Sequence, residues 1–248
     1  MRGFTFGTPL FSHGTSVMVK KYLLPFILVI GLVLFFATGL HRLLSFATLA
    51  AHYGEIKSFI SANQLTAYGL FFLLYFGAVA FSLPIASLLT LSGGALLGWG
   101  AALMILFAAT AGAGVVFIAA RSILADVLSA KAGPFLKKLE AGFQDNAFQY
   151  LLALRLVPIA PFWVVNIVPA LLGMRLGSFI IATFIGIMPG TLVYVYVARG
   201  FDHILAQGKA PDLSTLSDIR IIGPLAALGA LALMPTIIKV IKAKMNGK

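Results

Sequence analysis

The sequence predicts an all-α integral membrane protein, a helical bundle in which two opposed re-entrant hairpins form an inverted repeat. Apolar residues make up 60% of the chain and charged residues 10%, with a mean hydropathy of +1.03, whereas soluble domains carry about 25% charged residues. Several apolar stretches reach the roughly 20 residues that a helix needs to cross the hydrocarbon core. Two more stretches, residues 67–98 and 149–173, are interrupted by proline or glycine and resemble one another.

The N-terminal part, residues 1–66, predicts an anchor helix followed by an interfacial segment. Lys20 and Lys21 precede an apolar run over residues 22–40. This run exceeds the apolar core of about 7–15 residues found in cleavable signals, so we expect an uncleaved anchor. Residues 43–66 mix apolar and charged side chains, as helices at a membrane surface do.

The central part, residues 67–200, begins with the first broken segment, 67–98. Pro84 removes a backbone donor and clashes with the preceding turn, so a helix should break there. The pair Gly93 and Gly94 predicts a second interruption in the same segment. We therefore expect a hairpin that enters the membrane and returns to the same side.

Two unbroken spans are predicted in the central part, over residues 99–120 and 177–198. The amphipathic segment 121–148 lies between them and is expected at the membrane surface. The second broken hairpin, 149–173, follows this segment.

The C-terminal part, residues 201–248, predicts a polar loop, a last span over 221–238 and a basic tail. With two hairpins and four full spans, both termini lie in the cytoplasm of a multi-pass protein of the inner, or plasma, membrane. Most lysines and arginines then lie on the cytoplasmic side, as the positive-inside rule requires. The net charge of +11 thus indicates contact with anionic lipid head groups rather than nucleic acid.

An internal repeat relates the two hairpins. LPIAS at residues 83–87 resembles VPIAP at 157–161, and each is followed by ALLG, at 95–98 and 170–173. In this topology the two copies run in opposite directions, so their hairpins dip from opposite faces. Transporters built from inverted repeats place their substrate sites near the midplane, where the repeats meet.

The second hairpin contains an arginine and two prolines, Arg155, Pro158 and Pro161. Broken backbone persists at membrane depth only inside protein or beside water. An arginine at the bilayer centre costs roughly 2.5–3.5 kcal/mol on insertion scales, so its presence predicts a site. The planar guanidinium matches phosphate oxygens, and half-helix N-termini at the hairpin tips add positive dipole ends.

Polar residues of both hairpins complete the predicted substrate site. The set comprises Arg155, Pro158, Pro161 and Asn166 from the second hairpin, and Pro84, Ser87, Thr90 and Ser92 from the first. Asn166 and the hydroxyls are expected to line a polar path beside the guanidinium. The alternative is structural, with Arg155 capping hairpin carbonyls and Asn166 satisfying broken backbone.

Other chemistry-bearing patterns are weak. The histidines lack metal-ligand spacing, and the chain has no cysteine. The glycine-rich strings lack the lysine of a P-loop. Glu140 in the amphipathic segment has Arg121 and Lys137 as candidate ion-pair partners. We therefore expect no metal, no cofactor and no enzymatic activity, with membrane lipids as partners and a homo-oligomer as an open alternative.

The chain resembles the VTT-domain, or DedA, superfamily of SNARE-associated Golgi-type membrane proteins over residues 65–200, and in particular the branch related to the yeast Tvp proteins. The resemblance rests on LPxA…LLTLSGGALLG, LEAGF and RLVPIAPFWVVNIVPALLG. It implies two facing re-entrant hairpins and movement of lipids between leaflets, since members act as phospholipid scramblases or polyprenyl-phosphate translocases.

Individual positions match the superfamily unevenly. Arg155 and Pro158 match the arginine of its hairpin and the proline that follows. Pro161 stands where DedA-type members place a second arginine, and FSLPIASLLTLSGG lacks the acidic residue of their first hairpin.

The function predicted from these features is movement of phospholipid or polyprenyl phosphate between leaflets, with Arg155 at the phosphate. One alternative is a solute or ion transporter that uses the same midplane cavity, and another is a membrane scaffold. Proton relays need ionisable groups within the membrane, and the first hairpin contains no acidic residue. Lipid movement here should therefore proceed without a pH gradient, whereas a coupled transporter should respond to one. A scaffold should tolerate Arg155→Ala.

Overall fold

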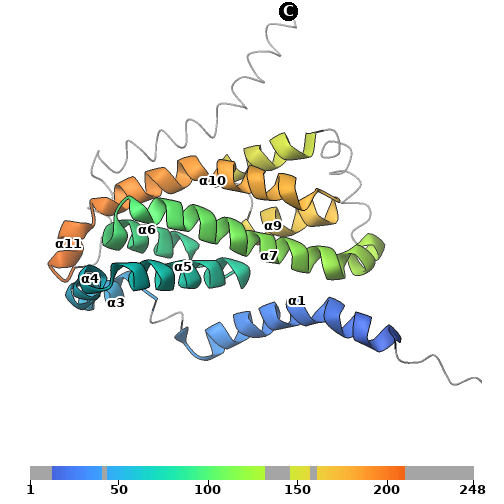
Figure 1. Ribbon diagram of the computed structural model, residues 1–248, viewed down its shortest axis with the longest axis horizontal. Coiled ribbons are helices and arrows are strands. Elements are labelled where there is room, and N and C mark those ends of the chain that lie inside the picture. The colour runs from blue at the N-terminus through green and yellow to red at the C-terminus, as the bar shows by residue number, and fades with distance from the viewer. Residues whose placement is uncertain (1–12, 41–43, 132–145, 157–160, 210–248) are drawn as a thin grey trace, which may run out of the picture.

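The computed structural model describes residues 13–40, 44–131, 146–156 and 161–209, and these residues form helices and no strand. The helices are α1 (His13–Ala37), α3 (Phe46–Ala51), α4 (Tyr53–Ala62), α5 (Gln64–Ala80), α6 (Ala86–Leu97), α7 (Gly100–Lys131), one over residues 146–156, α9 (Phe162–Leu171), α10 (Leu176–Arg199) and α11 (Asp202–Ala206). In Figure 1, α7 crosses the middle of the bundle, α1 runs alongside it, and α3, α4 and α11 gather at one end.

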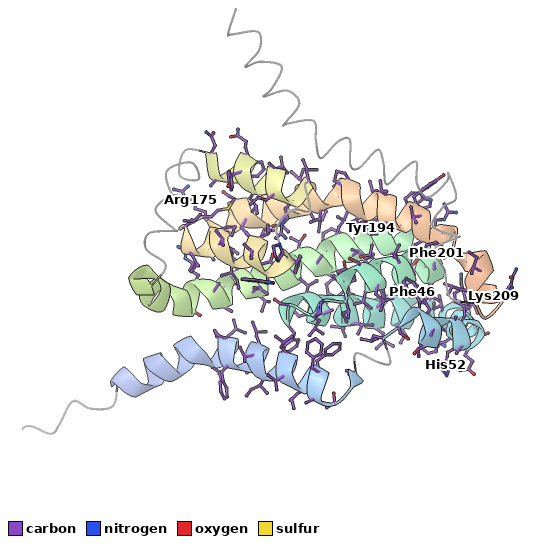
Figure 2. All side chains as sticks on the ribbon, turned by 180° about the vertical axis from the view of Figure 1, so that it is seen from behind. Phe46, His52, Arg175, Tyr194, Phe201 and Lys209 are labelled. Atoms are coloured by element: carbon purple, nitrogen blue, oxygen red, sulfur yellow. The ribbon has the colours of Figure 1, made fainter. Side chains whose placement is uncertain are left out.

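The two ends of the bundle carry different polar residues. Figure 2 shows Arg175 at one end, and His52 and Lys209 at the other. We call these the Arg175 end and the His52 end. Between them, side chains such as Leu103 and Phe107 are 62% and 58% exposed. Exposed apolar side chains between two polar ends are expected where a bundle is surrounded by lipid.

The described residues include two helices that are individually long and apolar enough to cross a membrane. They are α7, over Gly100–Ser122, and α10, and they coincide with the spans predicted over 99–120 and 177–198. A third span results if α4 and α5, which are bent by 120° at their junction, count as one broken span. The apolar part of α1, Leu23–Ala37, is shorter, and the span predicted over 221–238 lies outside the described residues.

The first broken segment forms a helical hairpin of α5 and α6. The Tyr68 hydroxyl donates to the Leu97 carbonyl over 3.3 Å, and the hydroxyls of Tyr75 and Thr90 lie 2.9 Å apart, nearer the turn. These pairs show that the two helices are antiparallel. The turn between them contains Pro84, where the sequence predicts a break.

The prediction of a second break at Gly93 and Gly94 is wrong, because α6 continues through both residues. A Cβ at Gly93 would lie 2.3 Å from a ring carbon of Phe71 in α5. A Cβ at Gly94 would lie 2.6 Å from Cβ of Ala198 and 3.0 Å from Cα of Val195, both in α10. The glycines therefore allow close helix packing, as small residues do in membrane proteins.

This packing predicts that Gly94→Ala lowers the stability of the protein. The added methyl group meets the backbone of α10, and overpacking of this kind costs about 1–3 kcal/mol. The matched control is Gly69→Ala in α5, where a Cβ meets nothing within 4 Å and alanine favours the helix by up to about 1 kcal/mol. Thermal unfolding in detergent should show a lower midpoint for Gly94→Ala only. Equal midpoints would contradict the packing.

The second broken segment pairs the helix over 146–156 with α9. Arg155 and Asn166 are hydrogen-bonded near the break, and Ala147 and Leu172 line one cavity at the other end. The two helices are therefore antiparallel as well. Pro161 immediately precedes α9, whereas Pro158 lies outside the described residues.

The two hairpins pack in a reciprocal way against the two spans. α6, from the first hairpin, packs against α10, and α9, from the second, packs against α7. The spans themselves are antiparallel, because Phe117 contacts Phe179 and Phe107 contacts Phe184, with ring centroids 4.4 and 5.3 Å apart.

The glycine of each ALLG motif has a positive φ near the end of a helix. Gly98 follows α6 with φ +61°, and Gly173 follows α9 with φ +75°. Glycine adopts a positive φ at little cost. Gly98 is itself the C-cap of α6, whereas Gly173 follows Leu172, the C-cap of α9, so the two copies share a glycine with positive φ at the helix end but not the same position in the cap.

The predicted interfacial segment, residues 43–66, contains α3 and α4 at the His52 end. The Ser45 side chain caps α3 by accepting from the Thr48 backbone N–H over 3.1 Å. Asp202 of α11 accepts from the Tyr53 hydroxyl and pairs with Lys57 over 3.0 Å. These contacts attach α4 to the end of the bundle.

Candidate functional site

Arg155 lies near the end of the helix over 146–156 and is held by two other elements. Its Nη2 donates to Oδ1 of Asn166 over 2.6 Å and to Oγ1 of Thr183 over 3.1 Å. Asn166 belongs to α9 and Thr183 to α10, and their side chains are buried. Hydrogen bonds to a charged group contribute about 1.5–3 kcal/mol each. They therefore fix one edge of the guanidinium.

Two aromatic rings flank the guanidinium. The ring centroids of Phe162 and Phe179 each lie 5.6 Å from Cζ of Arg155, within the range of cation–π attraction. Phe179 is fully buried, whereas Phe162 is 37% exposed. The guanidinium thus lies near one core ring and one partly exposed ring.

The site contains buried donors without acceptors. Neither Nε of Arg155 nor Nδ2 of Asn166 has a hydrogen-bond partner among the described residues. The described ion pair joins Lys57 and Asp202 at the His52 end, and no described carboxylate pairs with Arg155. A buried charge without a counter-charge is strongly unfavourable. An oxyanion beside Nε would supply both the missing charge and the missing acceptors.

Gly186 of α10 makes room for Arg155. A Cβ at this position would lie 2.5 Å from Cβ and 3.1 Å from Cγ of Arg155. Thr183 is seven residues beyond Leu176, the first residue of α10, so the guanidinium lies about 10 Å along the helix axis from the Arg175 end. The charge therefore lies within the length of an apolar span.

A cavity of about 480 Å³ lies at the Arg175 end, about 10 Å along α10 from Thr183. Its lining includes Arg175, Ser178 and Phe148. Arg175 precedes the first turn of α10, where backbone N–H groups and the helix dipole favour anions. Ser178 is adjacent in sequence to Phe179, which flanks the guanidinium.

Comparison with known proteins identifies the domain that contains this site. Residues 83–200 match the family model described as the VTT domain. This part of the chain is a VTT domain. The match contains α6, α7, α9 and α10, and therefore Arg155, Asn166, Thr183 and Gly186.

Curated relatives of this VTT-domain protein are named as transmembrane proteins. A Transmembrane protein 41 homolog of Dictyostelium discoideum is 29% identical over 196 residues, which cover 77% of this chain and 56% of the relative. Transmembrane protein 41B of Gallus gallus is 25% identical over 115 residues, which cover 46% and 42%. The chain thus spans about half the length of these relatives. No solved structure matches it.

These findings confirm the predicted VTT/DedA resemblance and show that the chain is a membrane protein. The assignment to a branch related to the yeast Tvp proteins stays a prediction, because the relatives reported above carry another name.

The structure brings two of the predicted site residues together and places the others elsewhere. It brings Arg155 and Asn166 together. Thr90 is buried, pairs with Tyr75 and donates to the Ala86 carbonyl over 2.8 Å, so its hydroxyl is used within the first hairpin. Pro84, Ser87 and Pro161 are exposed, and Ser92 lines a cavity beneath α3 and α4. Glu140 and Lys137, one of its two candidate ion-pair partners, lie outside the described residues, so the predicted pair of Glu140 with Arg121 or Lys137 stays a prediction.

Sequence reasoning missed the contribution of α10 to the site. Phe179, Thr183 and Gly186 follow one another at helical spacings of four and three, so they share one face of α10. A ring, a hydroxyl and a glycine on one face of an apolar span is a detectable signal. From the sequence we looked for a site only where the backbone is broken. An unbroken helix such as α10 forms all of its own backbone hydrogen bonds and therefore drew no attention.

Proposed function

We propose that this VTT-domain protein moves phospholipid or polyprenyl phosphate between the two leaflets, and that Arg155 binds the lipid phosphate during passage. The observation that carries the proposal is a partly buried arginine whose Nε is buried and unpaired and which has no carboxylate partner among the described residues. Guanidinium donors match phosphate oxygens in geometry and charge. Transient binding of a phosphate would compensate the buried charge without any covalent chemistry.

The proposed architecture is an inverted repeat of two re-entrant hairpins, as the sequence predicts. Reciprocal packing of α6 on α10 and of α9 on α7 supports it, as do the antiparallel spans and the positive φ that Gly98 and Gly173 share. In such a repeat the substrate site lies where the two copies meet. Phe179, which flanks Arg155, packs on Phe117 of the other copy's span.

The cavity at the Arg175 end supplies a mouth for the head group. Arg175 and the start of α10 attract an anionic group there. From this mouth to Thr183 the distance along α10 is about 10 Å. We further propose that the Arg175 end faces the cytoplasm of the inner, or plasma, membrane, with both termini on that side, in agreement with the positive-inside rule.

Leaflet exchange in proteoliposomes tests this function. Fluorescent phospholipid and polyprenyl phosphate are followed separately, with protein-free vesicles as the control, in the presence and absence of a pH gradient. The proposal expects faster exchange of at least one of these lipids without a gradient. Exchange that strictly requires the gradient would favour a coupled transporter. No acceleration of either lipid would overturn the proposal.

A further inference from the structure

An exposed aromatic cluster lies at the His52 end, where α10 ends and the turn after α6 leads into α7 (Figure 1). Cζ of Arg199 lies 5.4 Å from the ring centroid of Trp99, and the ring centroids of Trp99 and Tyr196 lie 6.5 Å apart. All three side chains are exposed, with Trp99 at 46% and Tyr196 at 48%. We call these three residues the Arg199 cluster. Cation–π attraction to Trp99 thus orients the guanidinium at the surface of the protein.

The guanidinium of Arg199 has no anionic partner in the part of the chain that the structure describes. The described ion pair at this end joins Lys57 and Asp202, and Asp202 also accepts from the Tyr53 hydroxyl. No described hydrogen bond or ion pair involves the side chain of Arg199, whose described contact is the ring of Trp99. Its N–H donors are therefore open to an external oxyanion, and they match phosphate oxygens in pairs.

The Arg199 cluster lies at the depth of the lipid head groups. Arg175 and Arg199 stand at the two ends of α10, about 36 Å apart at 1.5 Å per residue, whereas the hydrocarbon core is about 30 Å thick. The two arginines therefore reach the head-group regions of opposite leaflets. Tryptophan and tyrosine are enriched at this depth because their rings are amphipathic. The cluster is separate from the Arg155 site, since Thr183 lies about 24 Å from Arg199 along α10.

An apolar surface continues from the Arg199 cluster toward the middle of the membrane. On α7, the strongly exposed side chains of Leu103 and Phe107 follow Trp99 at intervals of four residues. On α10, the exposed Leu192 precedes Tyr196 by four residues. Residues four apart share one face of a helix, so these apolar side chains lie below the cluster. The surface therefore fits an amphiphile with a phosphate and an acyl chain, whereas a free phosphate would use only its upper part.

We propose that the Arg199 cluster binds the phosphate of an anionic phospholipid in the leaflet at the His52 end, with an acyl chain of the same lipid along Leu103, Phe107 and Leu192. An anionic lipid is favoured over a zwitterionic one, because no described carboxylate neutralises the charge of Arg199. The inference goes beyond the proposed function, because binding at this surface requires no movement of lipid. The lipid bound here is also a different molecule from one whose phosphate lies at Arg155.

The test uses the tryptophan of the cluster as its reporter. The chain contains two tryptophans, Trp99 and Trp163, so in a Trp163→Phe background the tryptophan fluorescence comes from the cluster alone. The protein is reconstituted in phosphatidylcholine vesicles with a minor fraction of phosphatidylglycerol or phosphatidylcholine that is brominated in its acyl chains. Bromine quenches tryptophan at short range, so the ratio of the two quenching curves gives the relative affinity for the two lipids. Size-exclusion profiles and thermal midpoints verify that each variant is folded.

Trp99 is expected to show an approximately fivefold preference for phosphatidylglycerol at low ionic strength. This ratio corresponds to about 1 kcal/mol, the attraction of one arginine to an anionic membrane surface. Arg199→Gln should remove the preference, because it removes the charge and leaves the ring and the apolar surface in place. Lys209→Gln is the matched control, since Lys209 is an exposed cation at the same end of the bundle (Figure 2) and is not part of the cluster. It should keep the preference.

Three results would overturn the inference. The first is equal affinity for the two lipids in the Trp163→Phe background, or an equal loss of preference in Arg199→Gln and Lys209→Gln. The second is loss of the preference in millimolar inorganic phosphate but not in chloride of equal ionic strength, which would assign the site to a free anion. The third is no quenching by either lipid, which would show that another part of the chain covers the cluster. Because lipid exchange is not measured, a failure of the proposed function leaves these outcomes unchanged.

Discussion

Arg155→Lys is expected to slow lipid exchange in proteoliposomes at least about tenfold, although it keeps the positive charge. The lysine ammonium is a point charge without the planar set of donors that matches phosphate oxygens in pairs, a set of which Nη2 alone is used by Asn166 and Thr183. It also lacks the Nε donor that is unpaired among the described residues. Arg155→Gln, which removes the charge, should slow exchange further.

The control for this series is Arg121→Lys, which changes an exposed arginine outside the hairpins. It should exchange lipid at the wild-type rate at equal reconstitution. Equal rates for Arg155→Lys and wild type would show that phosphate geometry at this position is irrelevant. Wild-type rates for Arg155→Gln would favour a scaffold, which needs no such charge.

Gly186→Ala is expected to reduce exchange nearly as much, while every charged group remains. The new methyl group would lie 2.5 Å from Cβ of Arg155, so the arginine or α10 must shift. A shift of this kind costs about 1–3 kcal/mol and moves the guanidinium away from Thr183. Exchange rate and thermal midpoint are measured together, so that a loss of rate can be compared with the loss of stability.

Gly190→Ala is the matched control in α10, because a Cβ at Gly190 meets nothing within 4 Å. It should retain the wild-type exchange rate. If both glycine variants exchanged lipid equally well, the position of Arg155 against α10 would not matter for passage, and the site as described would be contradicted.

The structural alternative, in which Arg155 caps hairpin carbonyls, predicts different hydrogen-bond partners. A role in capping hairpin carbonyls requires hydrogen bonds from the guanidinium to backbone oxygens. The described hydrogen bonds end on the side chains of Asn166 and Thr183, and the carbonyls of the hairpin break, residues 157–160, lie outside the described residues, so the capping role stays a prediction. Side chains from two further elements hold the group in place, as expected for a binding site whose geometry must be fixed.

The sequence predicts those features that depend on local chemistry. The spans α7 and α10 follow from apolar length, and the turn between α5 and α6 follows from Pro84, because proline breaks a helix whatever surrounds it. Arg155 attracts notice because a charge is costly in lipid wherever it lies.

Features that depend on a distant partner could not be predicted. A glycine in an apolar helix is consistent with a break or with a close helix contact. At Gly94 it allows a close contact with Ala198 and Val195, which lie about a hundred residues further along the chain. Thr183 and Gly186 belong to the site only because the second hairpin packs on α10.

Solid-state NMR can test the central claim, that Arg155 binds a lipid phosphate, without relying on transport. Arginine side chains are labelled with ¹⁵N, the protein is reconstituted in phospholipid, and dipolar dephasing by ³¹P is compared between wild type and Arg155→Lys. We expect wild type to show an additional guanidinium signal with a nitrogen–phosphorus distance of about 4 Å, absent from the variant. Identical dephasing in the two samples would contradict the assignment of Arg155 to the phosphate.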